Sequence, residues 1–489
     1  MEHVDGTPPR CNGHCGDVAA AERIARRSQN SDPQTLSLVQ KTNTTSRDIC
    51  RTEVLDSVRS DRQRKLVLHV DVRNTILVSD SATHDNVEHA LNTFLTGVTW
   101  GREEPSGWVW YSDHPSLRAP CPGVIMTWGS EEPFGWVWYS DRPSLRAPCP
   151  GVITYYKSRE RELVRSPADR ATLRRVTSDF TGQPIGRKFR KYFEQHLRLL
   201  EWNVPTSTKA ISNFSCDEPN SAMASSIYKA ARRNKPEVVS ADRKLTTVGA
   251  DGRLYHYLLP SFIKMLYDLQ AGGFRFSVIL RTYGLDAPKV LDSIQHIVAG
   301  NHPLFPGKLS INVNRRPGRI CRQPGGRVCC ELPPAAYGTD TTPPTVLETD
   351  ADIYRYMSDV DGICSFVDDF QFWQEHDYAH WGGKPLWIDL ADRDVQHIFF
   401  DDNIRVADAE GIVDVRLFDG DCASASGYRS LSIEEITPFE NVCLVQADLL
   451  DCTSNVDYFV NRVRQCEMNY TDWLHQRERS GMHYHEGHV

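Results

Sequence analysis

The 489-residue sequence lacks any apolar stretch of about 18 residues, the length that a membrane-spanning helix needs. Its opening residues, MEHVDGTPPRCNGHC, contain no apolar segment of the signal-peptide type. Its fourteen cysteines include no zinc-type CxxC pair, which favours reduced thiols over a metal-binding framework. We therefore predict a cytoplasmic or nuclear protein without membrane contacts.

An excess of positive charge is also missing, because the net charge is −8. This balance argues against a general polyanion binder. Residues 154–200 do hold twelve Lys/Arg against five Asp/Glu, but no aromatic-basic RNA motif accompanies them. Nucleic acid is therefore not an expected partner, and the sequence says nothing about the oligomeric state.

Residues 65–80, KLVLHVDVRNTILVSD, begin with an apolar run that ends at the carboxylate of Asp71. The run is partly β-branched and does not alternate strictly, which is typical of a strand covered on both faces in a parallel sheet. Such sheets bind ligands beyond the carboxyl ends of their strands, where Asp71 is expected to lie. The alternative is that Asp71 is a turn or helix-cap residue.

Three later segments each place a polar side chain at the end of an apolar strand or in a loop. Residues 254–273 carry apolar residues at helical spacing and lead into the buried-strand pattern FSVILRT, which ends on Thr282. A Gly-Gly-Lys-Pro loop contains Lys384, and HIFFDDN ends a third apolar strand on Asp401 and Asp402. Two adjacent carboxylates repel each other unless a cation lies beside them.

This order of Asp, Thr, Lys and paired Asp resembles the four motifs of the haloacid dehalogenase-like (HAD) superfamily. The resemblance covers roughly residues 65–447, although the motifs occupy only short islands within that span. It implies an α/β fold, with a Rossmann-like parallel sheet flanked by helices and large cap insertions. It also implies a hydrolase or phosphatase acting on a phosphorylated or other anionic small molecule.

The resemblance assigns the catalytic roles to Asp71, Thr282 and Lys384. Asp71 matches the nucleophile, Thr282 the hydroxyl that holds phosphoryl oxygens, and Lys384 the ammonium that offsets their charge. Lys289 and Lys308 remain alternatives to Lys384, because both also lie between Thr282 and Asp401.

The metal predicted from the resemblance is Mg²⁺. Asp71, Asp401 and Asp402 match the carboxylates that hold it, and carboxylate oxygens are suitable ligands for this cation.

One position departs from the family pattern. Family phosphatases place a second aspartate two residues after the nucleophile as general acid and base, but this chain has Arg73 there. Arginine stays protonated, so it cannot exchange that proton. We assign Arg73 and Thr75 to substrate binding instead. Two alternatives stay open: a hydrolase acting through Asp71, or a catalytically weak or inactive module that binds a ligand or a protein.

The motif positions also predict the domain organisation. Residues 61–84, 254–284 and 384–475 are expected to form the core, with insertions at 85–253 and 285–383. Residues 1–60 are expected to be a disordered tail and 476–489 a flexible one. The Pro-rich stretch 315–345 is typical of an exposed loop.

A tandem repeat lies within the first insertion. Residues 99–125 recur at 127–153 with three differences in 27 positions. Two copies are too few for a solenoid, and such near-identity indicates a recent duplication or a gene-model artefact. In the first copy, Trp108, Trp110 and Tyr111 are expected to pack a short hairpin, the alternative being a ligand-stacking surface.

Overall fold

Our computed structural model describes only parts of the chain between Arg64 and Ser480, so the predicted tail at 1–60 lies outside the described residues. The described ranges are 64–78, 86–103, 136–138, 143–148, 151–166, 169–203, 242–323, 325–333, 345–405, 411–418 and 427–480.

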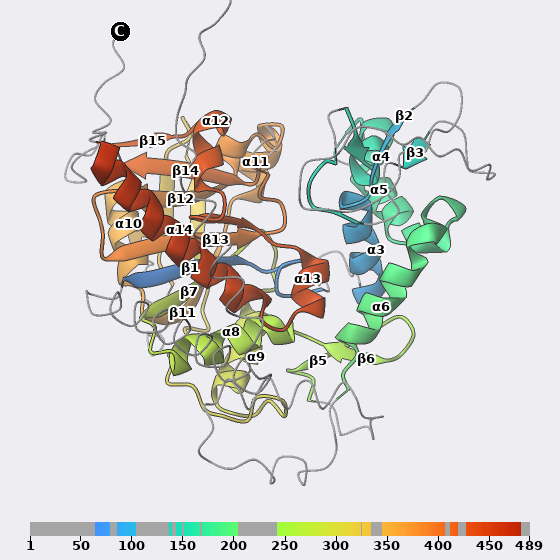
Figure 1. The fold of residues 1–489 in the computed structure, drawn as a ribbon, viewed down its shortest axis with the longest axis horizontal. Helices are drawn as coiled ribbons and strands as arrows, with labels where there is room; N and C mark the ends of the chain where they lie inside the picture. Colours follow the sequence, from blue (N-terminus) through green and yellow to red (C-terminus); the bar gives the residue numbers. More distant parts are fainter. Residues whose placement is uncertain are drawn as a thin grey trace, which may run out of the picture. The chain divides into compact units, whose positions relative to one another are not determined.

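Eight strands form one mostly parallel sheet in the order β10-β9-β8-β11-β7-β1-β13-β16. Figure 1 shows β13, β1, β7 and β11 side by side. Within this sheet only β9 runs in the opposite direction, antiparallel to both β8 and β10. The strands are β1 (Lys65–Asp71), β7 (Phe276–Thr282), β8 (Gly318–Arg322), β9 (Val328–Glu331), β10 (Val346–Leu347), β11 (Gly362–Val367), β13 (Val395–Asp401) and β16 (Leu444–Gln446).

Strand β1 lies at the switch point of the sheet. The strands that follow it in the chain, from β7 to β11, are added on one side of β1, and the later strands β13 and β16 are added on the other side. In open α/β sheets, the crevice at such a switch point is where ligands bind. The three strands predicted from apolar runs are β1, β7 and β13, and the structure confirms the mixed α/β class with a largely parallel sheet.

Helices cover both faces of this sheet, as its apolar strands predict. Successive side chains of a strand point to opposite faces, so Leu66 and Leu68 join one core and Val67 joins another. The first core is shared with helices α8, α9, α13 and α14, and the second with α10. Their bounds are α8 (Pro260–Ala271), α9 (Ala287–Val298), α10 (Asp350–Asp359), α13 (Leu449–Ser454) and α14 (Tyr458–Ser480).

Two of these helices differ from the sequence expectation. The helix expected from residue 254 begins at Pro260, a residue suited to the first helical turn, because Leu254–His256 instead forms strand β6. The closing helix α14 runs to Ser480, so 476–480 is helical, and 481–489 lies outside the described residues. Across the described ranges, no helix has the length and apolar character needed to cross a bilayer.

A second, smaller sheet carries the order β12-β14-β15. It consists of β12 (Lys384–Asp389), β14 (Val413–Phe418) and β15 (Tyr428–Ser430), with β12 parallel to β14. Lys384 was expected in a loop, but it is the first residue of β12, because its backbone N–H donates to Ile412 O at 2.7 Å. Leu386 and Val415 of this sheet share a core with Phe399 of β13.

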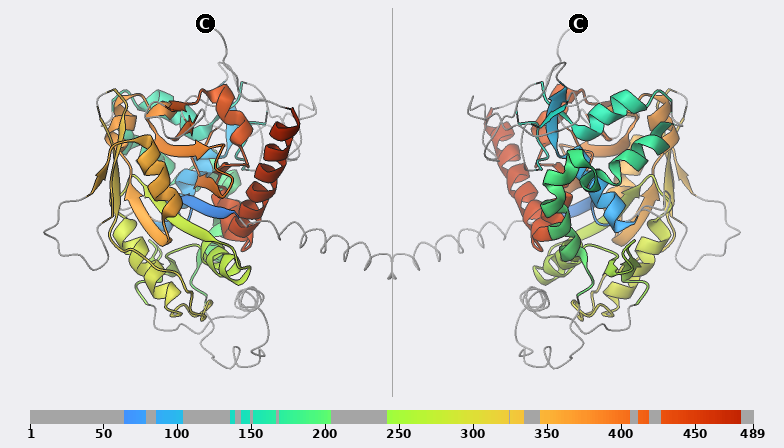
Figure 2. Two further views of the ribbon diagram at one scale, coloured as in Figure 1. Left: turned by 90° about the vertical axis from the view of Figure 1, so that its left-hand side faces the viewer. Right: turned by 90° about the vertical axis from the view of Figure 1, so that its right-hand side faces the viewer.

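The first insertion contributes a group of helices that pack on one another (Figure 2). Their buried Phe94, Phe180 and Phe193 belong to the same hydrophobic cluster as Leu66 of β1. The described helices of the insertion therefore share the core of the sheet. Its helices are α3 (Val87–Gly97), α4 (Tyr155–Leu163), α5 (Arg170–Thr177), η3 (Phe180–Gly182), η4 (Pro184–Phe189) and α6 (Arg190–Leu200), and β5 (Thr246–Val248) pairs with β6.

The segment expected as a second insertion, residues 285–383, supplies strands to the main sheet. Strand β11 pairs with both β7 and β8, and β8 and β9 form an antiparallel pair within the predicted 315–345 loop. Cys329 and Cys330 of β9 are buried. This part of the segment therefore belongs to the core, and the remaining elements within it are α11 (Phe370–Glu375) and η6 (His380–Gly382). After β15, the chain forms α12 (Ile433–Ile436) and η7 (Thr437–Phe439).

The described part of the tandem repeat pairs one copy with the other. Strand β2 (Trp100–Glu103) belongs to the first copy, and β3 (Trp136–Trp138) belongs to the second. The two are antiparallel, with Glu103 opposite Trp136, and β4 (Ile153–Thr154) pairs with the other edge of β2. The aromatic residues expected to form a hairpin in the first copy, 108–111, lie outside the described residues.

Deleting residues 104–131 should therefore keep this sheet. The deletion removes one repeat length and leaves the four residues Glu-Pro-Phe-Gly, 132–135, between the paired Glu103 and Trp136. Four-residue hairpin loops are common, and shortening the connection lowers its closure entropy. We expect thermal unfolding to show a stability that is unchanged or raised by up to about 2 kcal/mol.

A control tests whether the shortened chain still pairs β2 with β3. Val137→Pro in the shortened chain removes a donor from the strand opposite Arg102, so it should lower the melting temperature. A clear loss of stability from the deletion alone would contradict this account of the repeat.

Lowering the pH from 7 to 5 should remove part of the contribution of His397 to the stability of the sheet. Burial, assisted by the Lys65 ammonium, lowers the pKa of His397 to about 3. Its Nδ1 lies 2.9 Å from His69 Nε2 and its Nε2 lies 3.0 Å from Ser358 Oγ. The folded protein thus keeps a neutral ring where the unfolded chain, with a pKa of about 6.5, takes up a proton.

The contribution of His397 to the free energy of unfolding is complete above about pH 6.5. It is lost as the pH falls toward the pKa of His397 in the folded protein, at about 1.4 kcal/mol per pH unit. Urea unfolding at a series of pH values measures this slope. His397→Gln should reduce the slope by about that amount, and an unchanged slope would show that His397 does not cause it.

Candidate functional site

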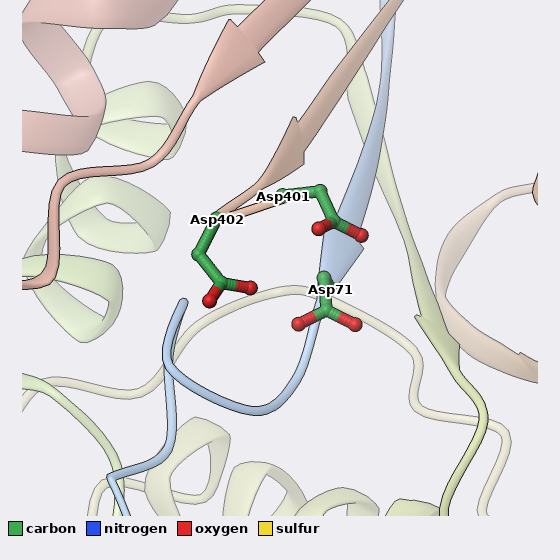
Figure 3. A group of neighbouring side chains, drawn as sticks. All are labelled: Asp71, Asp401 and Asp402. Carbon is green, nitrogen blue, oxygen red and sulfur yellow. The ribbon is translucent and has the colours of Figure 1, made fainter. Parts of the chain in front are cut away.

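Three carboxylates meet at the carboxyl ends of neighbouring parallel strands. Asp71 ends β1, Asp401 ends the adjacent β13, and Asp402 follows it. One oxygen from each lies within 4.8 Å of the others (Figure 3). Among the described residues, these three are the group whose spacing suits a metal ion.

Lys384 completes this cluster from the smaller sheet. Its Nζ donates to Asp71 Oδ1 at 2.5 Å and to Asp401 Oδ2 at 2.8 Å. The side chain is 1% exposed, so the ammonium is a buried counter-ion shared by two carboxylates. Of the alternative lysines, Lys289 lies over the ring of Tyr257, 4.2 Å from its centroid. The structure therefore brings Lys384 to Asp71.

Crowding shifts the pKa values of Asp71, Asp402 and Lys384. Burial raises the pKa of Asp71 to about 7, with Lys384 opposing and Asp401 reinforcing the shift. Burial and the charges of Asp401 and Asp71 also raise the pKa of Asp402 well above its usual value. Burial disfavours the charge on Lys384, but the two carboxylates outweigh it and hold the pKa of Lys384 above its ordinary value. The single ammonium does not balance three carboxylates.

Two threonine hydroxyls lie at the same sheet edge. Thr75 Oγ1 donates to Asp71 Oδ2 at 3.4 Å. Thr282 ends β7, one residue beyond Arg281, the residue paired with Asp71. Its Oγ1 accepts a hydrogen bond from Gly284 N at 2.9 Å, so its own proton remains for donation to another oxygen.

Arg73 lies in a tight turn after β1. Asn74 N donates to Leu77 O at 2.8 Å, and Asn74 has a φ of 55°. This left-handed conformation favours glycine or asparagine, so asparagine suits the position. The Asn74 side chain also hydrogen-bonds Asp402. Arg73 itself is half-buried.

The sequence did not identify Asn403 as a residue that hydrogen-bonds the carboxylate cluster. Asn403 N donates to Asp401 Oδ1 at 2.9 Å, and Asn403 Nδ2 donates to Asp402 Oδ1 at 3.1 Å. These bonds orient the paired carboxylates. The signal was present in HIFFDDN, where an amide side chain follows the two acids.

An aromatic pair borders Lys384. The Lys384 Nζ lies 5.0 Å from the centroid of the Tyr283 ring, close enough for a cation–π contact. Tyr283 stacks on Trp373 with centroids 5.4 Å apart. This side of the ammonium is therefore apolar, which strengthens its interaction with the carboxylates.

Comparison of the chain with protein-family models, with curated proteins and with solved structures found no match. What the site can do must therefore be argued from its own geometry.

Proposed function

We propose that the protein is a Mg²⁺-dependent hydrolase of the HAD-like type that removes phosphoryl groups through an aspartyl nucleophile, Asp71. The observation that carries this proposal is the Lys384 ammonium bridging Asp71 and Asp401 inside a group of three carboxylates. A purely structural ion pair needs one carboxylate per ammonium. Here three carboxyl groups share one ammonium at a strand-end crevice, where ligands bind in such sheets.

The carboxylates suit Mg²⁺, because this cation takes a few carboxylate oxygens and keeps waters and substrate oxygens as its other ligands. Asp71, Asp401 and Asp402 would hold it. When bound, it supplies positive charge that neutralises phosphoryl oxygens.

The chain's own residues account for the rest of the reaction. An Asp71 oxygen forms a bond to phosphorus while the ester P–O bond breaks and its electrons leave with the alcohol oxygen. Lys384 offsets the charge of the attacked phosphoryl group, and Thr282 donates its free hydroxyl proton to a phosphoryl oxygen. Water then attacks the phosphorus of the aspartyl-phosphate, which releases phosphate and restores Asp71.

Proton supply is the weak step. The leaving oxygen needs a proton unless its alcohol is already acidic, and Arg73 cannot give one. Aryl phosphates, whose leaving groups are stable as anions, should therefore react faster than alkyl phosphates.

Beryllium fluoride tests the proposal, because it binds to a carboxylate oxygen in place of a phosphoryl group. In the presence of Mg²⁺, we expect wild type to bind it, as followed by fluorine NMR, and to hydrolyse p-nitrophenyl phosphate. Asp71→Asn should do neither. Asp389→Asn, at the buried end of β12 and outside the cluster, is the matched control and should behave like wild type.

The second candidate is an inactive ligand-binding module, which the Arg73 position favours. It predicts Mg²⁺-dependent adduct formation on Asp71 without turnover of any ester. Absence of both adduct and turnover in wild type would contradict the hydrolase.

A further inference from the structure

We propose that Arg281 and Arg322 are positioning residues for Lys384. They hold the backbone carbonyls of the two residues that flank it, Pro385 and Gly383. The inference rests on the proposed function in so far as Lys384 serves the Asp71 site. The holding contacts themselves are independent of that function.

A positioning device is needed because the site spans two sheets. Asp71 and Asp401 belong to the eight-stranded sheet, whereas Lys384 belongs to β12 of the smaller one. No strand pairing joins the two sheets among the described residues. Apolar side chains pack between them, as Leu386 does with Phe399, but such contacts are non-directional and do not fix an ammonium to within a few tenths of an ångström.

Arg322 holds the carbonyl before the lysine. It ends β8 of the large sheet, and its Nη2 donates to Gly383 O at 2.6 Å. The same nitrogen lies 2.9 Å from Asp414 Oδ2 of the small sheet. The Arg322 side chain is 2% exposed and that of Asp414 is fully buried. Arg322 thus connects the two sheets through charge-assisted hydrogen bonds, which are stronger than neutral ones.

Arg281 holds the carbonyl after the lysine. It lies in β7, and its Nη1 donates to Pro385 O at 3.0 Å. Its other donors form a two-point ion pair with Asp368 at 2.9 and 2.5 Å, with both side chains buried. The Arg281 carbonyl also lies 3.5 Å from Lys384 Nζ.

The unpaired edge of β12 explains why arginines are used. Among the described strands, β12 pairs with β14 alone, and Pro385 has no N–H for a further strand. The buried carbonyls of Gly383 and Pro385 still require donors. Gly383 also cannot be larger, because a Cβ there would lie 2.1 Å from Ile412 O.

Arg416 provides a matched control. It is 4% exposed and shares Asp414 as a partner, with its Nε 2.7 Å from Asp414 Oδ2. Its other ion pair is with Asp350, at 2.8 Å. Among the described contacts, it holds neither carbonyl beside Lys384.

The test compares Arg322→Lys with Arg416→Lys. Both substitutions keep a positive charge that can pair with Asp414. A lysine ammonium, however, is a point charge and cannot make the several directed hydrogen bonds of the planar arginine guanidinium. The readout is acetylation of the Lys384 amine, measured by mass spectrometry relative to Lys289 in the same molecule. We expect Arg322→Lys to raise Lys384 labelling about tenfold through local opening and Arg416→Lys to leave it unchanged. Equal labelling in the two variants would overturn the proposal.

Turnover separates this inference from the proposed function. If wild type hydrolyses aryl phosphates, Arg322→Lys should lower kcat about 10²-fold, the cost of a displacement near 1 Å, with a smaller change in KM. If wild type has no activity, the proposed function fails, while labelling still decides the positioning role. Should Arg322→Lys fail to fold, Arg281→Lys carries the same test through the Pro385 carbonyl, with the same two outcomes.

Discussion

Replacing Arg73 with aspartate is expected to raise the turnover of an alkyl phosphate by about 10²- to 10⁴-fold, the range contributed by general acid catalysis. The substitution places a proton donor two residues after Asp71, the proposed nucleophile. An alkyl alcohol is a poor leaving group without a proton, so its hydrolysis should gain most. The turn that carries residue 73 is held by backbone bonds between Val72, Asn74 and Leu77, so it should survive the change.

The leaving group provides the internal comparison. p-Nitrophenyl phosphate needs little proton assistance, so Arg73→Asp should change its turnover far less than that of an alkyl ester. Steady-state rates for the two esters, at saturating Mg²⁺, give this ratio. Arg73→Asn is the control, since it removes the guanidinium without adding an acid, and it should leave the ratio as in wild type. An equal gain in turnover with both esters would show that the lack of a general acid at residue 73 does not limit the hydrolysis of alkyl phosphates.

Replacing Lys384 with methionine is expected to cost about 3–5 kcal/mol of stability without Mg²⁺, the usual penalty for removing one partner of a buried ion pair. Asp71 and Asp401 would both lose the donor that lies 2.5 and 2.8 Å away. Urea unfolding in the presence of EDTA measures the loss. Lys289→Met, at an exposed lysine over Tyr257, should cost far less.

Added Mg²⁺ should recover part of the stability of Lys384→Met, because a bound cation replaces some of the missing positive charge and ligands stabilise the state they bind. Turnover should not recover, since the ammonium proposed to offset the phosphoryl charge is absent. A loss equal to that of Lys289→Met would show that Lys384 is not the counter-ion of this cluster.

Strand ends and their order were predictable because they depend on local pattern. Apolar runs identified β1, β7 and β13, and each ends on the residue that the pattern singled out: Asp71, Thr282 and Asp401. Their convergence followed from one general property, that the carboxyl ends of adjacent parallel strands share an edge. Their proposed chemistry remains a prediction.

Pairing between distant segments was not predictable. The Pro-rich stretch after residue 315 was expected to be a loop, yet β8 and β9 pair within it, and β11 lies beside β7. Proline and glycine mark turns but do not exclude short strands between them. Strand β2 likewise pairs with a strand of the other repeat copy, a choice that two near-identical sequences leave open.

The sequence by itself determined which residues end the strands and in which order they follow one another, since hydrophobic pattern and side-chain chemistry are local. Only the tertiary structure decided that Lys384 reaches Asp71 from a second sheet. Only it revealed that Arg281 and Arg322 hold the neighbouring carbonyls. The physical reason is that buried charges choose partners by position in space, and the hydrogen bonds that join Arg322 to Gly383 and Asp414 span 61 and 92 residues of chain.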